Sequence, residues 1–467
     1  MSLCLPGPLL LLAEGNLGAT LGLWTVLPFL ALLLCIAVLP LVAGHWWEHN
    51  RNKAIVVALL SVPLVAYQLL AFGEVGQHEL LHKGMEYASF IVLLTSLFVI
   101  TGGVYVGGSL SGTPLVNTGL LAIGALIASF VGTTGASVLL IRPLLRANAS
   151  RQRKVHIVVF FIFVVSNCGG LLTPLGDPPL FLGYLKGVPF EWTLQLWKEW
   201  LLVNAALLVL FNFWDQRVLD AEERERPGSQ LEEAMKHEPL RIEGGLNFLF
   251  LLGIVATIFC AGAGLGNGGE PWPFGWQEGS MLALSLGAWF TTRPENRHRN
   301  RFTWTPVIEV AVLFAGIFVT MTPALLILNA WGQGQREVLG LAFDMRHPAQ
   351  FFWSTGLLSS FLDNAPTYLT FASTACGLEG VPLEGRYLAK LLAHTEGGGI
   401  GTHLLMAISC GSVFMGANTY IGNGPNFMVK AIAEESGVKM PSFFGYMAYS
   451  GLILLPLFGI VTLLFLR

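Results

Sequence analysis

Long runs of apolar residues are the feature of this sequence that most constrains its fold. Several of them hold about 20 residues, the length that a helix needs to cross the hydrocarbon core of a bilayer. Charged residues make up only 12% of the 467-residue chain, about half the share found in soluble globular proteins, and hydrophobic residues make up 54%. We therefore expect an all-α polytopic membrane protein. The formal net charge of −3 shows no basic excess, so no nucleic-acid partner is expected.

The apolar runs predict membrane spans and two stretches of a different kind. Spans are expected at 22–43, 54–72, 87–110, 155–187, 193–215, 246–266, 277–292, 304–331, 400–435 and 443–466. The stretches 115–146 and 348–376 are apolar but carry a turn-like cluster at mid-length, Gly132–Gly135 in the first and Asp363–Pro366 in the second. We expect each to be a re-entrant hairpin, which enters and leaves the membrane on one side.

The spans form two halves with the same order of elements: three spans, a hairpin, a broken span and a final span. The halves, 22–215 and 246–467, follow an N-terminal outer segment (1–21) and are joined by an expected cytoplasmic linker (216–245). Five spans is an odd number, so the second half must lie inverted relative to the first. Matching residues recur in the same order. Gly170, Thr173, Gly176 and Pro179 recur 246 positions later as Gly416, Thr419, Gly422 and Pro425, and Ser129-Phe130-Val131 recurs 231 positions later as Ser360-Phe361-Leu362. Inverted repeats of this kind are typical of secondary transporters.

Basic residues give the expected orientation. With the N-terminus outside, the inner loops and span ends hold most of the 26 Lys and Arg residues, among them Arg142, Arg146 and Arg151 beside the first hairpin. Cytoplasmic loops of membrane proteins carry such an excess. We expect a multi-pass protein of the cell's inner (plasma) membrane, with the first hairpin opening from the cytoplasm and the second from outside.

Glycine, proline and small polar residues interrupt two of the spans. The first breaks between Ser166 and Pro179, the second between Gly416 and Asn426. Backbone groups at membrane depth must be buried in protein or line a wet cavity, and the ends of half-helices add partial charges. The two breaks and two hairpin tips can converge near the midplane, where we expect an ion or small-solute site. Its candidate residues are Thr133, Thr134, Ser166, Asn167, Thr173, Asn418, Thr419 and Asn423.

Acidic residues favour a cation over an anion at this site. Two of the chain's five aspartates, Asp177 and Asp363, fall in a break and at a hairpin tip. Each could instead cap a helix, because Asp177 precedes two prolines and Asn364 could act as a cap before Pro366. Asn423, at the position matching Asp177, would cap equally well without the cost of a charge at this depth. We expect Asp177 and Asp363 to handle the ion.

A buried aspartate also suggests a mechanism. Away from water a carboxyl group favours its neutral form, so it can hold a proton and exchange it for Na⁺. Occupancy by either a proton or a cation is the minimum that an antiporter requires. Glu309 lies in an otherwise apolar span and could assist, although a packing role explains it equally well.

One motif indicates a different class of protein. His78-Glu79-Leu80-Leu81-His82 matches H-E-x-x-H, in which two histidines one helical turn apart bind zinc and the glutamate acts as base. A membrane zinc metalloprotease is therefore an alternative hypothesis. The motif falls in a short outer loop with no obvious third ligand beyond Glu86, and a loop helix that leads into the span at 87 is the other interpretation.

The interrupted segments resemble those of the ion-transporter superfamily, which includes NhaD-type sodium/proton antiporters, citrate and dicarboxylate carriers, and arsenite permeases. The similar runs are SNCGGLLTPLGDPP (166–179), SSFLDNAPT (359–367) and GANTYIGNGPN (416–426), within a resemblance that covers residues 22–467. The sodium/proton antiporters are the most similar branch. The resemblance implies a homodimer with a fixed scaffold and a transport domain that moves as an elevator, and it implies that Asp177, Asp363 and Asn364 handle the ion. The Ser-Asn-Thr signature of dicarboxylate carriers is absent, because Cys168 follows Asn167 and Tyr420 follows Thr419.

The first hypothesis is a secondary transporter that exchanges Na⁺ or Li⁺ for H⁺ by alternating access. The rival in the same class is a sodium- or proton-coupled carrier of citrate-like anions, which half-helix N-termini can hold without Arg or Lys. We expect no enzyme activity and no cofactor. The expected partners are Na⁺ and H⁺ as transported ions, the lipid bilayer and a second copy of the chain.

Overall fold

The computed structural model describes residues 17–228, 238–340, 342–396 and 399–466. Nearly all of its regular structure is helical, and within those ranges seven helices are long and apolar enough to cross a membrane. The predicted fold class, an all-α polytopic membrane protein, is confirmed.

The element boundaries follow the predicted order closely. The first half contains α2 (Leu17–Thr20), η1 (Leu23–Val26), α3 (Leu27–Val42), α4 (Gly44–Trp47), α5 (Asn50–Thr101), β1 (Tyr105–Ser109), α6 (Pro114–Val131), α7 (Thr133–Ala147), α8 (Val155–Val164), η2 (Cys168–Leu171), α9 (Pro178–Leu185), η3 (Phe190–Leu196) and α10 (Trp197–Glu225). The linker strand is β2 (Glu238–Glu243), and the second half contains α12 (Asn247–Gly262), α13 (Trp276–Thr291), α14 (Pro294–Arg299), α15 (Thr305–Gly332), α16 (Pro348–Ser359), α17 (Asn364–Leu378), α18 (Tyr387–Glu396), α19 (Gly401–Met415), η4 (Gly416–Asn418), α20 (Gly424–Glu435) and α21 (Phe443–Phe465).

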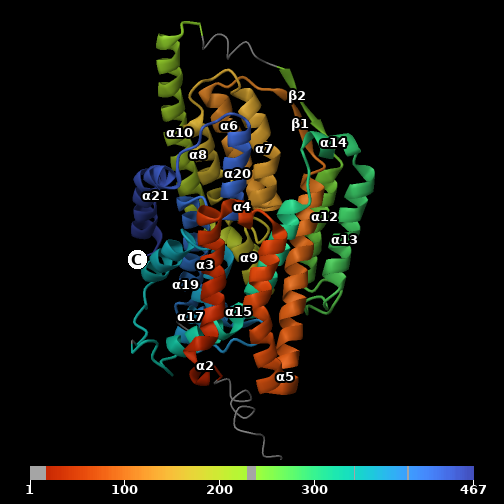
Figure 1. Cartoon of the computed structure of the whole chain (residues 1–467), viewed down its shortest axis with the longest axis vertical. Coiled ribbons are helices and arrows are strands. Elements are labelled where there is room, and N and C mark those ends of the chain that lie inside the picture. Colours follow the sequence, from red (N-terminus) through yellow and green to blue (C-terminus); the bar gives the residue numbers. More distant parts are fainter. Residues whose placement is uncertain (1–16, 229–237, 341, 397–398, 467) are drawn as a thin grey trace, which may run out of the picture.

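Both predicted hairpins are pairs of helices separated by a short tip. The first is α6 and α7, with Gly132 between them in a left-handed conformation (φ 82°) that favours glycine. The second is α16 and α17, with Asp363 at the start of α17. In Figure 1, α6 and α7 lie toward the upper end of the molecule and α17 toward the lower end.

The two broken spans run in opposite directions between these ends. The first consists of α8, η2 and α9, and the second of α19, η4 and α20. Helix α20 lies beside α7 at the upper end, whereas α17 packs on α9 and α16 packs on α19 (Figure 1). Each hairpin therefore contacts the broken span of the other half as well as its own.

Helix α5 differs from the sequence expectation. The predicted spans 54–72 and 87–110 both lie within α5. Gly73 alone has non-helical backbone angles (φ 52°, ψ −124°), and the helix bends sharply at this residue. The segment between them, expected as a loop, is helical. The helix ends at Thr101 rather than near residue 110, because Gly102 and Gly103 terminate it and Tyr105–Ser109 then pairs with β2 as an antiparallel strand.

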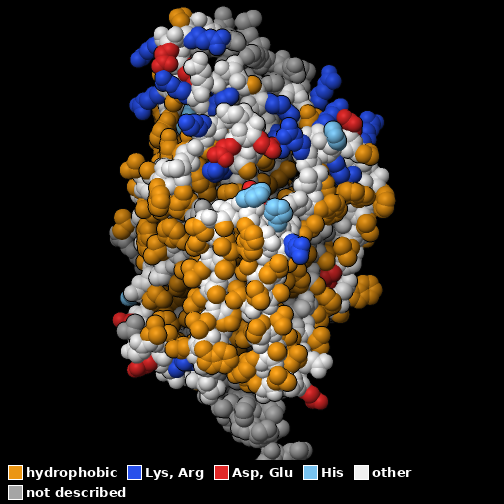
Figure 2. Space-filling model, in the orientation of Figure 1, with side chains coloured by type: hydrophobic (Ala, Val, Ile, Leu, Met, Phe, Trp, Pro, Cys, Tyr) orange, Lys and Arg blue, Asp and Glu red, His pale blue; other side chains and the backbone are white. Residues whose placement is uncertain are grey.

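The helices form two groups, which meet along α15, because that helix packs against α17 as well as against α5. Helix α5 packs against α3, α13 and α15, and α12 packs against α13; we call these the α5 group. The hairpins and broken spans, α6–α10 and α16–α21, form the hairpin group, whose helix α8 is apolar on all sides and buried. Figure 2 shows hydrophobic side chains over a broad band, with Lys and Arg gathered toward the end that carries α10, α14 and the strands.

Candidate functional site

Four elements that are far apart in the sequence meet at the carboxylate of Asp177. Asp177 lies in the gap before α9 and is 1% exposed. Its Oδ1 accepts hydrogen bonds from Thr133 Oγ1 at the first hairpin tip (2.9 Å) and from Asn423 Nδ2 in the second break (3.1 Å). Its Oδ2 accepts from Asn364 Nδ2 at the second hairpin tip (2.5 Å). Both breaks and both hairpin tips thus contribute to one centre.

The local sequence explains why the Asp177 carboxylate is available. Two prolines follow Asp177 and start α9, while Asp177 itself is extended (φ −147°, ψ 144°) and its side chain makes no capping bond to that helix. Asn423 precedes α20 with almost the same angles (φ −151°, ψ 140°). The capping alternative for Asp177 is therefore wrong, and its carboxylate instead bonds to Thr133 of its own half and to Asn364 and Asn423 of the other half.

The two breaks have matching internal contacts. The Thr173 hydroxyl donates to the Ser129 carbonyl, and the Thr419 hydroxyl donates to the Ser360 carbonyl. These are the residues that the sequence pairs between the halves. The roles of Thr173 and Thr419 are to fasten each break to the first arm of its hairpin.

Close glycine contacts shape both breaks in the same way. A Cβ atom on Gly176 would lie 2.0 Å from the carbonyl oxygen of Gly170, and one on Gly422 would lie 2.6 Å from that of Gly416. Each break therefore needs glycine where its backbone crosses itself. This contact gives a physical reason for the matched glycines in the sequence.

Buried amides connect the two breaks around Asp177. Asn423 Nδ2 also lies 3.2 Å from both Asn167 Oδ1 and the Ser166 carbonyl oxygen. Asn167 Nδ2 donates to Asn426 Oδ1 (2.6 Å). The Ser166 hydroxyl is bonded to Ser137 Oγ (2.8 Å) and not to the carboxylate. The site is consequently rich in neutral donors, and the side chains that donate to Asp177, those of Thr133, Asn364 and Asn423, carry no charge.

Other predicted site residues lie beside this centre. Asp363 is half-buried and accepts a hydrogen bond from the Ala365 backbone N–H (3.1 Å), so the capping role proposed for it is confirmed. Asn364 is fully buried and bonded to Asp177, so it is not the cap. Asn418 Nδ2 donates to Ser360 Oγ (2.8 Å), which leaves its Oδ1 without a partner.

Glu309 has a different role from the accessory one considered for it. Its carboxylate forms a 2.7 Å ion pair with Lys53, which is 3% exposed, and both residues belong to the α5 group. The packing explanation therefore holds for Glu309. It supplies a counter-charge to a buried lysine near the start of α5.

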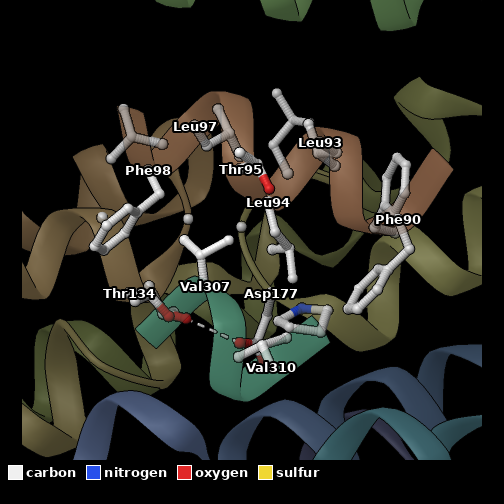
Figure 3. Close-up of a pocket in the computed structure, with 18 of the residues that line it drawn as sticks. Phe90, Leu93, Leu94, Thr95, Leu97, Phe98, Thr134, Asp177, Val307 and Val310 are labelled. Carbon is white, nitrogen blue, oxygen red and sulfur yellow. Dashed lines mark hydrogen bonds between the residues drawn. The ribbon is translucent and has the colours of Figure 1, made fainter. Parts of the chain in front are cut away.

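A cavity reaches Asp177 from the side of the α5 group. Its walls are mostly apolar and include Leu94 and Phe98 from α5 and Val307 and Val310 from α15. Figure 3 shows Asp177 at the edge of this space, facing those side chains. Residues 132–135 of the first hairpin tip, including the half-buried Thr134, line the same cavity. The cavity is a route along which a small solute could approach the carboxylate.

The H-E-x-x-H residues His78, Glu79 and His82 lie on α5, on exposed positions. His82 Nε2 lies 3.0 Å from Glu86 Oε1, whose carboxylate also pairs with Lys83 and Lys186. In the part of the chain that the structure describes, no three His, Cys, Asp or Glu side chains are grouped as metal ligands would be. Glu86, the possible third zinc ligand, is held by lysines instead.

One residue of the Asp177 centre, Asn426, is not among the site residues predicted from the sequence. Asn426 is fully buried and donates through Nδ2 to the carbonyls of Gly416 and Thr419, at 2.9 Å each. Leu180 occupies the matching position of the first break. The difference between Leu180 and Asn426, in segments that otherwise match, is the feature of the sequence that could have identified Asn426 as a site residue.

Comparison with known proteins agrees with a transport role for this fold. Residues 18–466 match the sequence model of a family described as "Putative citrate transport". The match includes both hairpins and both breaks. No curated protein matches the chain.

Proposed function

This chain belongs to the family described as putative citrate transport, and we propose, from the geometry of Asp177, that it is a secondary transporter that exchanges Na⁺ for H⁺ at that residue. In one state the carboxyl group holds a proton. Loss of that proton leaves a carboxylate that binds Na⁺, and the two occupants exclude each other.

One observation carries this proposal: the carboxylate that joins all four interrupted elements is buried and has only neutral side-chain partners. Burial without a counter-charge is costly, so the group requires a bound proton or cation. Thr133, Asn364 and Asn423 donate to its oxygens and support the ionised form. They come from three elements, so release of the proton affects the contacts of both halves at once.

Alternating access requires the Asp177 centre to open to each side in turn. We infer that the end with most Lys and Arg faces the cytoplasm of an inner (plasma) membrane, with the N-terminus outside. The division into an α5 group and a hairpin group fits an elevator in which the hairpin group moves against the α5 group. A homodimer built on the α5 group would hold that scaffold still.

Proteoliposomes with an internal pH indicator test the exchange. We expect an imposed pH gradient to collapse on addition of NaCl to the wild-type protein, and Asp177→Asn to abolish that response. Asp344→Asn is the matched control, since it removes the same charge from an exposed position. A response that survives in Asp177→Asn, or that Asp344→Asn removes equally, contradicts the proposal.

A coupled carrier of citrate-like anions is the second candidate, because the family description favours it. Helices α9 and α20 begin directly after Asp177 and Asn423, so their N-termini could hold carboxylate groups once Asp177 is neutralised. Citrate-dependent uptake of labelled sodium, without proton release on addition of NaCl, would select this function over the antiporter.

A further inference from the structure

We propose that the Asn426 amide occupies the place in the second break where a cation could otherwise bind, so that the transporter binds one cation per chain. This inference rests on the proposed function at Asp177 and adds its stoichiometry. It names Asn426 as a residue that positions the site and limits its occupancy.

The starting observation is that the two breaks share internal contacts, although the first begins after Val164 and the second only after Met415, which matches Gly169. The same threonine-to-carbonyl bonds and the same close glycine pairs occur in both. Two equivalent gaps, each flanked by backbone carbonyls, are the expected result of such a repeat. Unwound carbonyls of this kind are ligands for Na⁺ in transporters.

Asn426 changes the second gap. Its Nδ2 lies 2.9 Å from the carbonyl oxygens of both Gly416 and Thr419, and its Oδ1 accepts from Asn167. An amide NH₂ group has two donor hydrogens, so these two carbonyls use both of them. A cation that approached the carbonyl pair would have to displace this amide, whose three hydrogen bonds are all made in a fully buried position.

The first gap has no such group. Leu180 stands at the matching position, and an apolar side chain cannot donate to the carbonyls of Gly170 and Thr173. The Thr173 carbonyl accepts the Gly176 backbone N–H (3.0 Å), and a carbonyl oxygen has a second lone pair for a cation. The acidic residues also favour a cation in the first break only, because Asn423 stands in the second break where the first has Asp177. The acid of the second half near the centre, Asp363, is half-buried and accepts a hydrogen bond from the Ala365 N–H.

Substitution of Asn426 by aspartate removes the hydrogen bonds to the Gly416 and Thr419 carbonyls and adds a negative charge. The new carboxylate has nearly the same shape but cannot donate to the two carbonyls, so three oxygens would face one another with no hydrogen between them. A hard cation relieves that arrangement because oxygen atoms are its preferred ligands. Asn426→Asp should therefore gain a second cation site. Asn426→Leu, which copies the first half, frees the two carbonyls but supplies no negative charge, because Asn423 stands where the first break has Asp177, so it should not gain a site.

The test is equilibrium binding of labelled sodium to purified full-length protein, with melting temperature measured across NaCl concentrations. We expect one Na⁺ per chain for wild type, two for Asn426→Asp with an added rise of melting temperature in NaCl, and one for Asn426→Leu. Two ions per wild-type chain, or no change in sodium dependence in Asn426→Asp, would overturn the inference. If Asn426→Asp does not fold, the wild-type count alone decides.

These outcomes separate the inference from the proposed function. Asp177→Asn should abolish sodium binding to the wild-type background if the proposed function is right. If wild type binds no sodium at all, exchange at Asp177 fails, and so does the stoichiometry of one. If wild type binds two ions and Asp177→Asn removes only one of them, exchange at Asp177 stands while the role of Asn426 fails.

Discussion

Asn423, the residue of the second half that matches Asp177 in the first, donates a hydrogen bond to Asp177 itself, from Nδ2 to Oδ1 over 3.1 Å. The two matched positions thus touch each other across the centre of the molecule. One has kept a carboxyl group and the other presents an amide, so the pair can hold the negative charge of a single carboxylate without direct repulsion. Two carboxylates at this separation could not both be ionised.

Thr133 and Thr134 form a natural pair for testing the hydrogen bonds to Asp177. Thr133→Val removes a donor to the carboxylate while keeping the shape of the side chain. A hydrogen bond to a charged group contributes about 1.5–3 kcal/mol, so the apparent affinity for Na⁺ should fall by roughly tenfold or more. Sodium titration of transport in proteoliposomes measures this change. Thr134→Val, which alters a cavity-lining hydroxyl with no bond to Asp177, should change affinity less than twofold; equal effects would argue against the assigned geometry.

Asp363 allows the role of a helix cap to be separated from the role of a charge. Asparagine caps helices as well as aspartate does, so Asp363→Asn should keep the stability of the protein, whereas Asp363→Ala should cost about 1 kcal/mol. We expect Asp363→Asn to transport with a weaker apparent affinity for Na⁺, since it loses a negative charge near the site. Thermal unfolding and sodium titration of both variants make the comparison. Complete loss of transport in a stable Asp363→Asn protein would show that Asp363 binds the ion directly.

The glycine contacts within the breaks predict a sharp difference between two alanine substitutions. Gly176→Ala places a Cβ atom against the Gly170 carbonyl, so the first break must rearrange and transport should be lost. Gly424→Ala adds the same methyl group at the start of α20, where no atom lies within 4 Å, and should behave as wild type. Expression, melting temperature and exchange activity are the measurements. Normal activity in Gly176→Ala would mean that the break is not as tight as described.

A buried ion pair connects the two helix groups on the side away from the basic end. Lys186, at the end of α9, is 3% exposed and pairs with Glu86 on α5, which Lys83 and His82 also contact. Breaking a buried pair by removing one partner costs about 3–5 kcal/mol, while replacing both partners costs much less. Glu86→Gln should therefore lower the melting temperature more than Glu86→Gln combined with Lys186→Met. Additive losses would show that the two side chains do not depend on each other.

The placement of the breaks and hairpin tips could be predicted from sequence because their cause is local. Glycine, proline and small polar residues cannot continue an apolar helix, and they appear in the same order in both halves. The boundaries of α6, α7, α16 and α17 accordingly lie close to the expected ones. Helix α5 was harder to predict, because the single residue that reverses it, Gly73, lies among helix-forming neighbours.

The partners within the site could not be predicted, because they depend on how four distant elements meet. Asn364 and Asp363 are adjacent at one hairpin tip, and either could cap the helix. The structure gives the cap to Asp363 and turns the Asn364 amide to Asp177, in the other half. The sequence also suggested that Glu309 could assist at the ion site, because nothing near it in the sequence identifies Lys53 as its partner.

The strand pair at the basic end constrains the order in which this protein can fold while it is being synthesised. Strand β1 belongs to the first half, but its partner β2 lies in the linker, and Arg299 of α14 then pairs with Glu243 of β2 over 3.1 Å. In the described part of the chain, five α-helices and two 3₁₀ helices are synthesised between β1 and β2, so β1 emerges from the ribosome with an unpaired edge. The first half therefore cannot complete its fold until the linker has been synthesised. Strand β2 then pairs with β1 and, through Glu243, also contacts α14 of the second half.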